Sequence, residues 1–233
     1  MAGLDYRTAL IVGAGSGLSA SLARGLSAAG VSVALAARSI DKLAALTKET
    51  GAVAFACDSS DPAGVAALFK GVADRVGEPD VVVYNPSYRV RGPIVELDQA
   101  EVAKTLAVTA FGGFLVGQEA TKRMLPHGRG AILFTGASAS VKGYPLSAPF
   151  AMGKFALRGL AQSMARELAP KGIHVAHFVI DGGIRSARRA ETAEAPDSLL
   201  DPDAIADSYL HVLGQPRSAW TWELELRPWV ERF

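Results

Sequence analysis

The chain has 233 residues, of which 49% are hydrophobic and 20% are charged, and its formal net charge is +1. This length fits one α/β domain with a sizeable core, and the near-zero charge argues against strong attraction to nucleic acid or to an anionic membrane. The single cysteine, Cys57, excludes an intrachain disulfide and fits a reducing, cytoplasmic compartment. We expect no signal peptide at the N-terminus and, without a run of 18 apolar residues, no membrane-spanning helix.

Short apolar runs alternate with longer segments at helical spacing along the whole chain. This alternation predicts right-handed βαβ crossovers and a parallel sheet covered by helices on both faces. No repeat or linker divides the chain, so we expect one doubly wound, Rossmann-type α/β domain of about seven strands over residues 1–233. The expected strands are 7–12, 31–37, 52–57, 80–84, 131–135, 173–180 and 221–226, and the expected helices are 17–29, 40–49, 62–76, 99–124, 148–169 and 202–213.

Several residue types mark where these helices begin. Ser39, Asp61 and Asp98 each precede a helical pattern and can accept hydrogen bonds from its free N–H groups. Inside the long helix, Gly112 and Gly113 lower the helix propensity and indicate close packing at that point.

The first predicted strand ends in three glycines at alternate positions, Gly13, Gly15 and Gly17. Glycines in such a turn permit positive φ and let a bulky anion approach the backbone. Free N–H groups around Ser16 and Leu18, at the positive end of the next helix, then face that anion. Because the turn lies between a strand and a helix, we expect it to bind a dinucleotide pyrophosphate. The alternative is a simple strand-to-helix turn without a ligand.

Side chains at the ends of the next strands indicate which dinucleotide fits. The second strand ends at Arg38, where an acidic residue would bind the ribose diol of NAD. The Arg38 guanidinium can instead pair with a 2′-phosphate, which favours NADP over NAD unless Arg38 is only a solvated surface residue. Asp58 can accept a hydrogen bond from the adenine amino group or serve as a turn residue, and Asn85 lies at the edge of the same cleft. No metal site is expected.

Taken together, these residues resemble the short-chain dehydrogenase/reductases over essentially the whole chain. The resemblance rests on Gly13-x-x-x-Gly17, Asp58, the Asn85 region, the long helix before Met124, and the segments 150–157 (with Lys154) and 165–175. At the position of the family's third glycine this chain has Ser19. The resemblance implies hydride exchange between a nicotinamide and a carbonyl or alcohol. It also implies a small-molecule substrate and a homodimer or homotetramer.

The chain departs from this family at the residues that would transfer a proton. The family's catalytic tyrosine matches Phe150, which has no ionisable proton, and its asparagine in the long helix matches Thr109. The serine position falls on Ala137, and a one-residue change in loop length would bring Ser138 into place. Lys154 is kept, and the resemblance implies that it bonds the nicotinamide ribose.

Any reductase activity therefore requires another proton donor. Ser138 and Tyr144 rank first, followed by Tyr88 and an ordered water near Lys154. The favoured function is an NADP-dependent oxidoreductase with an atypical donor. Two alternatives stay open: a catalytically silent dinucleotide-binding protein acting as a sensor or oligomer partner, and reduction of an activated double bond with a proton from water.

A charged, irregular stretch follows the sixth predicted strand, where the resemblance places a variable lid at about residues 183–215. It carries Arg185, Arg188 and Arg189, which could meet an anionic substrate such as a phosphate-bearing acyl thioester. A solvated charged loop is the favoured interpretation of these arginines.

Overall fold

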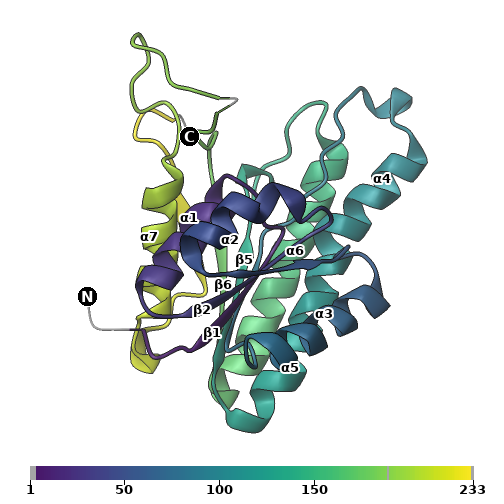
Figure 1. Cartoon of the computed structure of the whole chain (residues 1–233). Coiled ribbons are helices and arrows are strands. Elements are labelled where there is room, and N and C mark those ends of the chain that lie inside the picture. The colour runs from purple at the N-terminus through teal and green to yellow at the C-terminus, as the bar shows by residue number, and fades with distance from the viewer. Residues whose placement is uncertain (1–3, 188, 232–233) are drawn as a thin grey trace.

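The computed structural model describes residues 4–187 and 189–231, and a single parallel sheet runs through its centre (Figure 1). Within these residues seven strands lie in the order β3-β2-β1-β4-β5-β6-β7. They are β1 (Thr8–Val12), β2 (Ser32–Ala37), β3 (Val53–Ala56), β4 (Val81–Tyr84), β5 (Gly130–Thr135), β6 (Ile173–Ile180) and β7 (Glu223–Leu226). The expected doubly wound α/β fold is confirmed.

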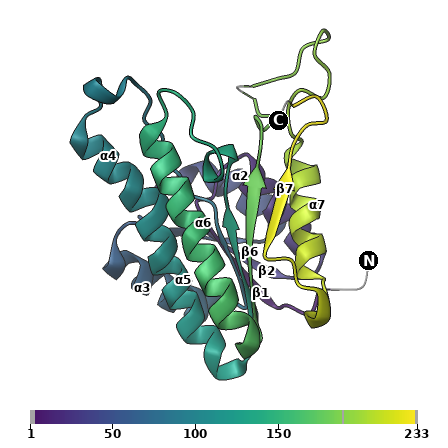
Figure 2. The ribbon, with the colours of Figure 1, turned by 180° about the vertical axis from the view of Figure 1, so that it is seen from behind.

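Helices cover both faces of this sheet (Figures 1 and 2). One layer holds α1 (Leu18–Ala28), α2 (Ala44–Thr50) and α7 (Pro202–Leu213), and the other holds α3 (Pro62–Arg75), α4 (Gln99–Leu106), α5 (Gly112–Met124) and α6 (Ala148–Leu168). The chain winds outward from β1 in one direction and from β4 in the other. Their carboxyl ends therefore form the switch point, where ligands of such sheets bind.

The central strands are apolar on both faces because both faces are covered. Every residue of β1 and β4 is buried, as their near-continuous apolar sequences predict. Two cores result, one between the sheet and α1, α2 and α7, the other between the sheet and α3, α5 and α6. Each large side chain in them, such as Phe69 or Phe178, contributes roughly 1.5–3 kcal/mol by leaving water.

Two of the three predicted helix caps are confirmed. Asp61 accepts hydrogen bonds from the N–H groups of Ala63 and Gly64 at 3.2 and 3.0 Å, and Asp98 accepts one from Glu101 at 2.9 Å. The prediction for Ser39 is wrong. A 3₁₀ turn at Asp41–Leu43 precedes α2, so the helical segment begins after Ile40 and no side chain caps it.

The long helix predicted for 99–124 is divided by a π-helical turn at Ala107–Phe111. The close packing predicted at its glycines is present: a Cβ on Gly112 would lie 2.5 Å from the Tyr84 hydroxyl, and one on Gly113 would lie 2.5 Å from Leu157. Among the described residues, the helical stretch Gln99–His127 alone has the length and hydropathy to cross a membrane. In this fold Leu115, Val116, Ala120 and Met124 of this stretch belong to the core on the sheet, whereas Phe111 and Phe114 are exposed.

The stretch 183–215, where a lid is expected, contains a helix in its second half. Pro202–Leu213 forms α7, which lies beside α1 and buries Ile205, Tyr209 and Val212 in the core (Figure 1). The buried Tyr209 hydroxyl is 3.0 Å from the Thr135 hydroxyl, so it keeps a hydrogen bond. Residues 183–187 and 189–201, which we call the irregular segment, follow β6 and contain no helix or strand.

Candidate functional site

The glycine turn after β1 combines one strained position with two open ones. Gly13 has φ +84°, and a Cβ there would lie 2.6 Å from the backbone nitrogen of Pro86. A Cβ on Gly15 or Gly17 would meet no protein atom within 4 Å. Positive φ, which we expected to matter along the turn, is therefore required at Gly13 alone. The other two glycines leave the backbone bare at the start of α1, as a bound anion needs.

Hydrogen bonds fasten this turn to the end of β4. The Ser19 hydroxyl donates to the Gly13 carbonyl at 3.1 Å, and the Asn85 side-chain amide donates to the Ser19 hydroxyl at 2.7 Å. The Asn85 backbone N–H donates to the Val12 carbonyl at 3.0 Å. Ser19 thus supplies a link that a glycine at this position could not make.

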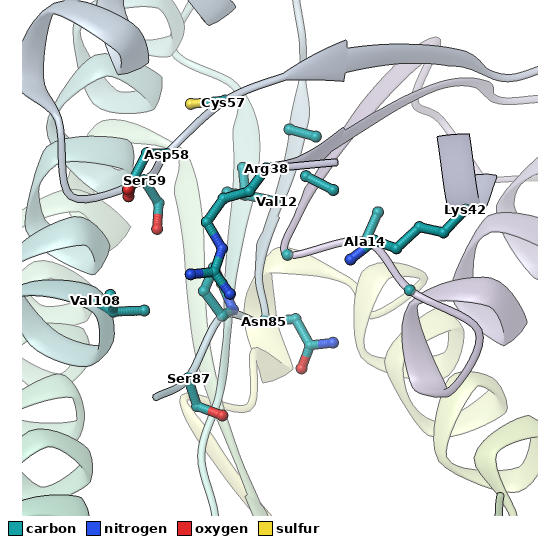
Figure 3. A pocket seen from close by; sticks show the side chains of 15 residues that line it. Val12, Ala14, Arg38, Lys42, Cys57, Asp58, Ser59, Asn85, Ser87 and Val108 are labelled. Atoms are coloured by element: carbon teal, nitrogen blue, oxygen red, sulfur yellow. The ribbon is translucent and has the colours of Figure 1, made fainter. Parts of the chain in front are cut away.

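A cavity of about 310 Å³, which we call the first cavity, opens above this turn between the ends of β1, β2, β3 and β4. Figure 3 shows Arg38 extending into it from the end of β2, and Lys42 pointing toward the turn at Ala14. Two cations therefore line the first cavity. Sequence reasoning found Arg38 but missed Lys42, which lies in the 3₁₀ turn Asp41–Leu43 that follows the end of β2.

Asp58 lines the same cavity, and it also orders the turn after β3. Its carboxylate accepts hydrogen bonds from the Ser60 backbone N–H at 2.9 Å and the Ser60 hydroxyl at 2.7 Å. These bonds, with a smaller contribution from the Arg38 charge, lower the pKa of Asp58. The structure shows the turn role of Asp58, and its place in the cavity wall is compatible with the second alternative, a hydrogen bond from an adenine amino group.

A second cavity of about 820 Å³ continues from the first, and Asn85 and Ser87 belong to the walls of both. It brings together four of the side chains singled out in the sequence: Ser138, Tyr144, Phe150 and Lys154. They come from the loop after β5 and from the first turns of α6. The carboxyl edge of the sheet thus carries one extended cleft.

Two other candidates do not line this cavity. The Tyr88 hydroxyl donates to the Glu101 carboxylate and accepts from Lys104. The fully buried Thr109 lies in the π-helical turn, where it packs against Gly153 and accepts a 3.4 Å hydrogen bond from the Tyr88 N–H. Neither side chain is among the residues that face the cavity.

Lys154 is the cation at the base of the second cavity. Its side chain is 3% exposed, and its ammonium donates to the Thr135 carbonyl at 2.7 Å. No carboxylate of the described residues lies within 4 Å, and burial lowers the pKa of Lys154 to about 8. A lysine whose pKa is lowered so that it can lose its proton near neutral pH is typical of catalytic positions.

Two buried serines shape the wall beside Lys154. The Ser140 hydroxyl accepts from the Ala137 N–H at 3.1 Å and fixes the turn that begins at Ser138. The Ser147 hydroxyl lines the second cavity, is buried, and has no hydrogen-bond partner among the described residues. Sequence reasoning missed Ser147. Its place immediately before α6 suggests an ordinary cap, yet it makes no capping bond.

The arginines near the irregular segment differ in their surroundings. Arg185 pairs with Asp201, which fits a solvated charged loop, and Arg188 lies outside the described residues. Arg189 lines the second cavity, together with Arg89 and Arg91 from the loop after β4, which sequence reasoning had not singled out. The Arg89 guanidinium lies 4.8 Å from the centre of the Phe150 ring.

The fold and this cleft define a nucleotide-binding α/β domain. A family model described as short chain dehydrogenase matches residues 7–197, and the chain belongs to this family.

Relatives share the fold along most of their length. A D-threitol dehydrogenase of Mycolicibacterium smegmatis is 33% identical over 177 residues, which are 74% of this chain and 68% of the relative. The crystal structure of a short-chain dehydrogenase from Rhodopseudomonas palustris is 36% identical with a TM-score of 0.83, covering 96% of this chain and 99% of that one. A metagenomic short-chain oxidoreductase in complex with NADP is 28% identical with a TM-score of 0.83, covering 97% and 99%.

Proposed function

We propose that this protein is an NADP(H)-dependent oxidoreductase that acts on a carbonyl or alcohol compound and uses an atypical proton donor. The observation that carries the proposal is the continuous cleft from the bare glycine turn to buried Lys154, with Arg38 and Lys42 in the wall beside the turn. The relative named as a D-threitol dehydrogenase and the related structure in complex with NADP support it.

The residues of the first cavity fit an adenine dinucleotide phosphate. Backbone N–H groups from Gly15 to Leu18, including Ser16, would hold the pyrophosphate at the start of α1, where nothing covers Gly15 or Gly17. The N–H groups of Gly13 and Ala14 donate to the Ala36 carbonyl at 2.9 Å, so Gly13 would shape the turn beside the cofactor. Arg38 and Lys42 would hold the 2′-phosphate, and Asp58 the adenine amino group. Asn85 keeps the turn in shape, and Lys154 would bond the nicotinamide ribose. When bound, the cofactor supplies or accepts the hydride.

The proton requires a different source from the usual phenol, since Phe150 stands where the family resemblance places the tyrosine. Hydride arriving at a carbonyl carbon leaves an alkoxide that must be protonated. The Lys154 ammonium, with a pKa of about 8, is acidic enough to serve. The cavity hydroxyls of Ser138, Ser147 and Tyr144 would relay its proton or orient the carbonyl.

A catalytically silent dinucleotide-binding protein is the weaker alternative. The relatives are named as dehydrogenases, and burying Lys154 without a counter-ion lowers stability for no evident structural gain. Reduction of an activated double bond would use the same cleft. Steady oxidation of NADPH in the presence of an enone would test it.

We further propose a homo-oligomer, formed through the outer surfaces of α5 and α6, in a cytoplasmic setting. Four apolar side chains there are 43–50% exposed: Phe111, Phe114, Met152 and Phe155. Phe111 and Phe114 stack with ring centres 6.3 Å apart, which gives this surface a flat aromatic patch. A Phe114→Glu change should shift the sedimentation coefficient toward that of the monomer.

Calorimetric titration with NADPH and NADH tests the proposed function. Wild-type protein should bind NADPH more tightly, and Arg38→Asp should weaken NADPH roughly tenfold or more while changing NADH little, because only NADPH carries the 2′-phosphate. Arg166→Asp is the matched control, since Arg166 is exposed on α6, away from the cavity wall, and donates a 3.4 Å hydrogen bond to Gln162. Equal losses for both nucleotides would remove Arg38 from the phosphate site. A folded protein that binds neither nucleotide would end the proposal.

A further inference from the structure

Three guanidinium groups converge on the second cavity from two distant parts of the chain. Arg89 and Arg91 belong to the loop after β4, and Arg189 belongs to the irregular segment after β6. Backbone bonds hold both segments: Gly92 donates to Leu146 at 3.1 Å, and bonds of 2.9 and 2.8 Å join Arg185 and Gly183 to Leu200 at the other end of the irregular segment. Within that segment, Ser186 and Arg189 exchange bonds of 2.9 and 3.0 Å. The convergence therefore belongs to the fold rather than to one flexible side chain.

These three arginines have no counter-ion within the described residues. None lies within 4 Å of a carboxylate there, and the carboxylate that lines the same cavity, Glu231, pairs with none of them. Arg185, on the same segment, pairs with Asp201. The cavity thus combines four cations, counting Lys154, with one carboxylate.

The like charges oppose one another at this site. Partial burial, followed by the charges of Arg91 and Arg189, lowers the pKa of Arg89. A bound anion would offset this repulsion. It would also accept hydrogen bonds from several guanidinium N–H groups at once, which is how arginine binds carboxylate and phosphate.

The Phe150 ring fixes where such an anion would lie. The Arg89 guanidinium sits 4.8 Å from the centre of the ring, and the Lys154 ammonium sits 5.9 Å from the same point. A guanidinium stacked on an aromatic face keeps its N–H groups free at the edge. The two cations are therefore separated by no more than the sum of these ring distances.

We propose that the second cavity takes an anionic substrate, a compact carbonyl or alcohol compound whose carboxylate or phosphate is bound by Arg89, Arg91 and Arg189. Because the Arg89 guanidinium and the Lys154 ammonium both lie beside the Phe150 ring, at most about 11 Å apart, one substrate can present its anion to Arg89 and its reacting carbon near Lys154. The proposal rests on the proposed function for the assignment of that carbon, but the anion site itself stands on the charges of the cavity.

Binding of three matched aldehydes tests the proposal by calorimetry, with NADPH-saturated and with cofactor-free protein. The probes are 4-formylbenzoate, its neutral methyl ester, and 4-formylphenyl phosphate. One or both anions should bind roughly tenfold or more tightly than the ester, and their affinity should fall with added salt. The tighter of the two anions identifies the group as carboxylate or phosphate.

Substitutions then locate the site. Arg89→Gln and Arg91→Gln, both at exposed loop positions, should each weaken the anions severalfold and leave ester binding unchanged. Arg185→Gln removes the same charge from the irregular segment but not from the cavity wall, so it should change neither. Circular dichroism and the NADPH dissociation constant confirm that each variant is folded.

Three results would overturn the proposal: equal affinity for acid and ester, saturable binding of neither anion, or the same loss in Arg185→Gln as in Arg89→Gln. Failure of the proposed function has a different signature. In that case NADPH would not bind, while cofactor-free protein would still prefer the anions in an arginine-dependent manner.

Discussion

Replacing the buried lysine by methionine should make the protein more stable while it weakens the cofactor site. Burial shifts the pKa of Lys154 from 10.5 to about 8, so at pH 7 the charged form costs about 3 kcal/mol of folding free energy. Lys154→Met removes this cost. It also removes the 2.7 Å hydrogen bond to the Thr135 carbonyl, worth about 1 kcal/mol. The expected net gain is about 2 kcal/mol, or roughly 4–8 °C in Tm for a domain of this size.

The pH dependence of this gain has a definite sign. Below pH 8 the lysine is protonated in both the folded and unfolded chains, so the full cost is present. Between pH 8 and 10.5 the unfolded chain holds the extra proton, so the wild-type protein becomes more stable as pH rises. The advantage of Lys154→Met should therefore be largest at neutral pH and should shrink toward pH 10.5.

Urea denaturation of cofactor-free protein at neutral and alkaline pH, at one protein concentration, measures both effects. Lys70→Met is the matched control, because the Lys70 side chain is 75% exposed and should show no such pH-dependent difference. The reasoning is refuted if Lys154→Met is no more stable than wild type at neutral pH, or if its advantage persists unchanged at alkaline pH. NADPH titration of the same variant should show weaker binding.

Three further changes probe the cleft. Gly13→Ala should lower the free energy of unfolding by roughly 2 kcal/mol or more, because the φ of Gly13 is +84° and a Cβ would press against Pro86. Gly15→Ala should leave stability unchanged and weaken NADPH binding. Wild-type stability of Gly13→Ala in urea would contradict this account. Asn85→Ala should lower stability by about 1 kcal/mol and loosen the turn, since the Ser19 hydroxyl loses its donor; unchanged stability and unchanged NADPH affinity would show that the link is dispensable. Phe150→Tyr should raise NADPH-dependent carbonyl reduction, followed by NADPH absorbance, and a folded variant that binds NADPH without any gain would count against the assigned geometry.

The fold was predictable because its signals are local. Buried parallel strands require continuous apolar runs, and helices beginning at Asp61 and Asp98 carry their caps in the sequence. The π-helical turn was not predictable, since one extra residue per turn leaves no distinct composition. The helix expected at residues 202–213 was predictable from local signals too, since Asp201 and Pro202 mark its start in the sequence.

The site was only half predictable for a different reason. The glycine turn, Arg38 and Lys154 lie within segments whose own sequence indicates their place. Arg89 and Phe150 meet only because β4 and β5 are neighbours in the sheet, so no local pattern joins them. The unpaired state of a charged side chain is likewise a property of the folded surroundings, and composition does not reveal it.

The shared wall between the two cavities has a thermodynamic consequence. Asn85 and Ser87 border both spaces, and Asn85 is held rigidly through Ser19. A ligand in the first cavity and a ligand in the second would therefore contact the same side chains. Each ligand would change the binding affinity of the other by the same factor. Affinities measured for either partner alone should differ from those in the ternary complex, and the size of that difference would report how tightly this wall couples them.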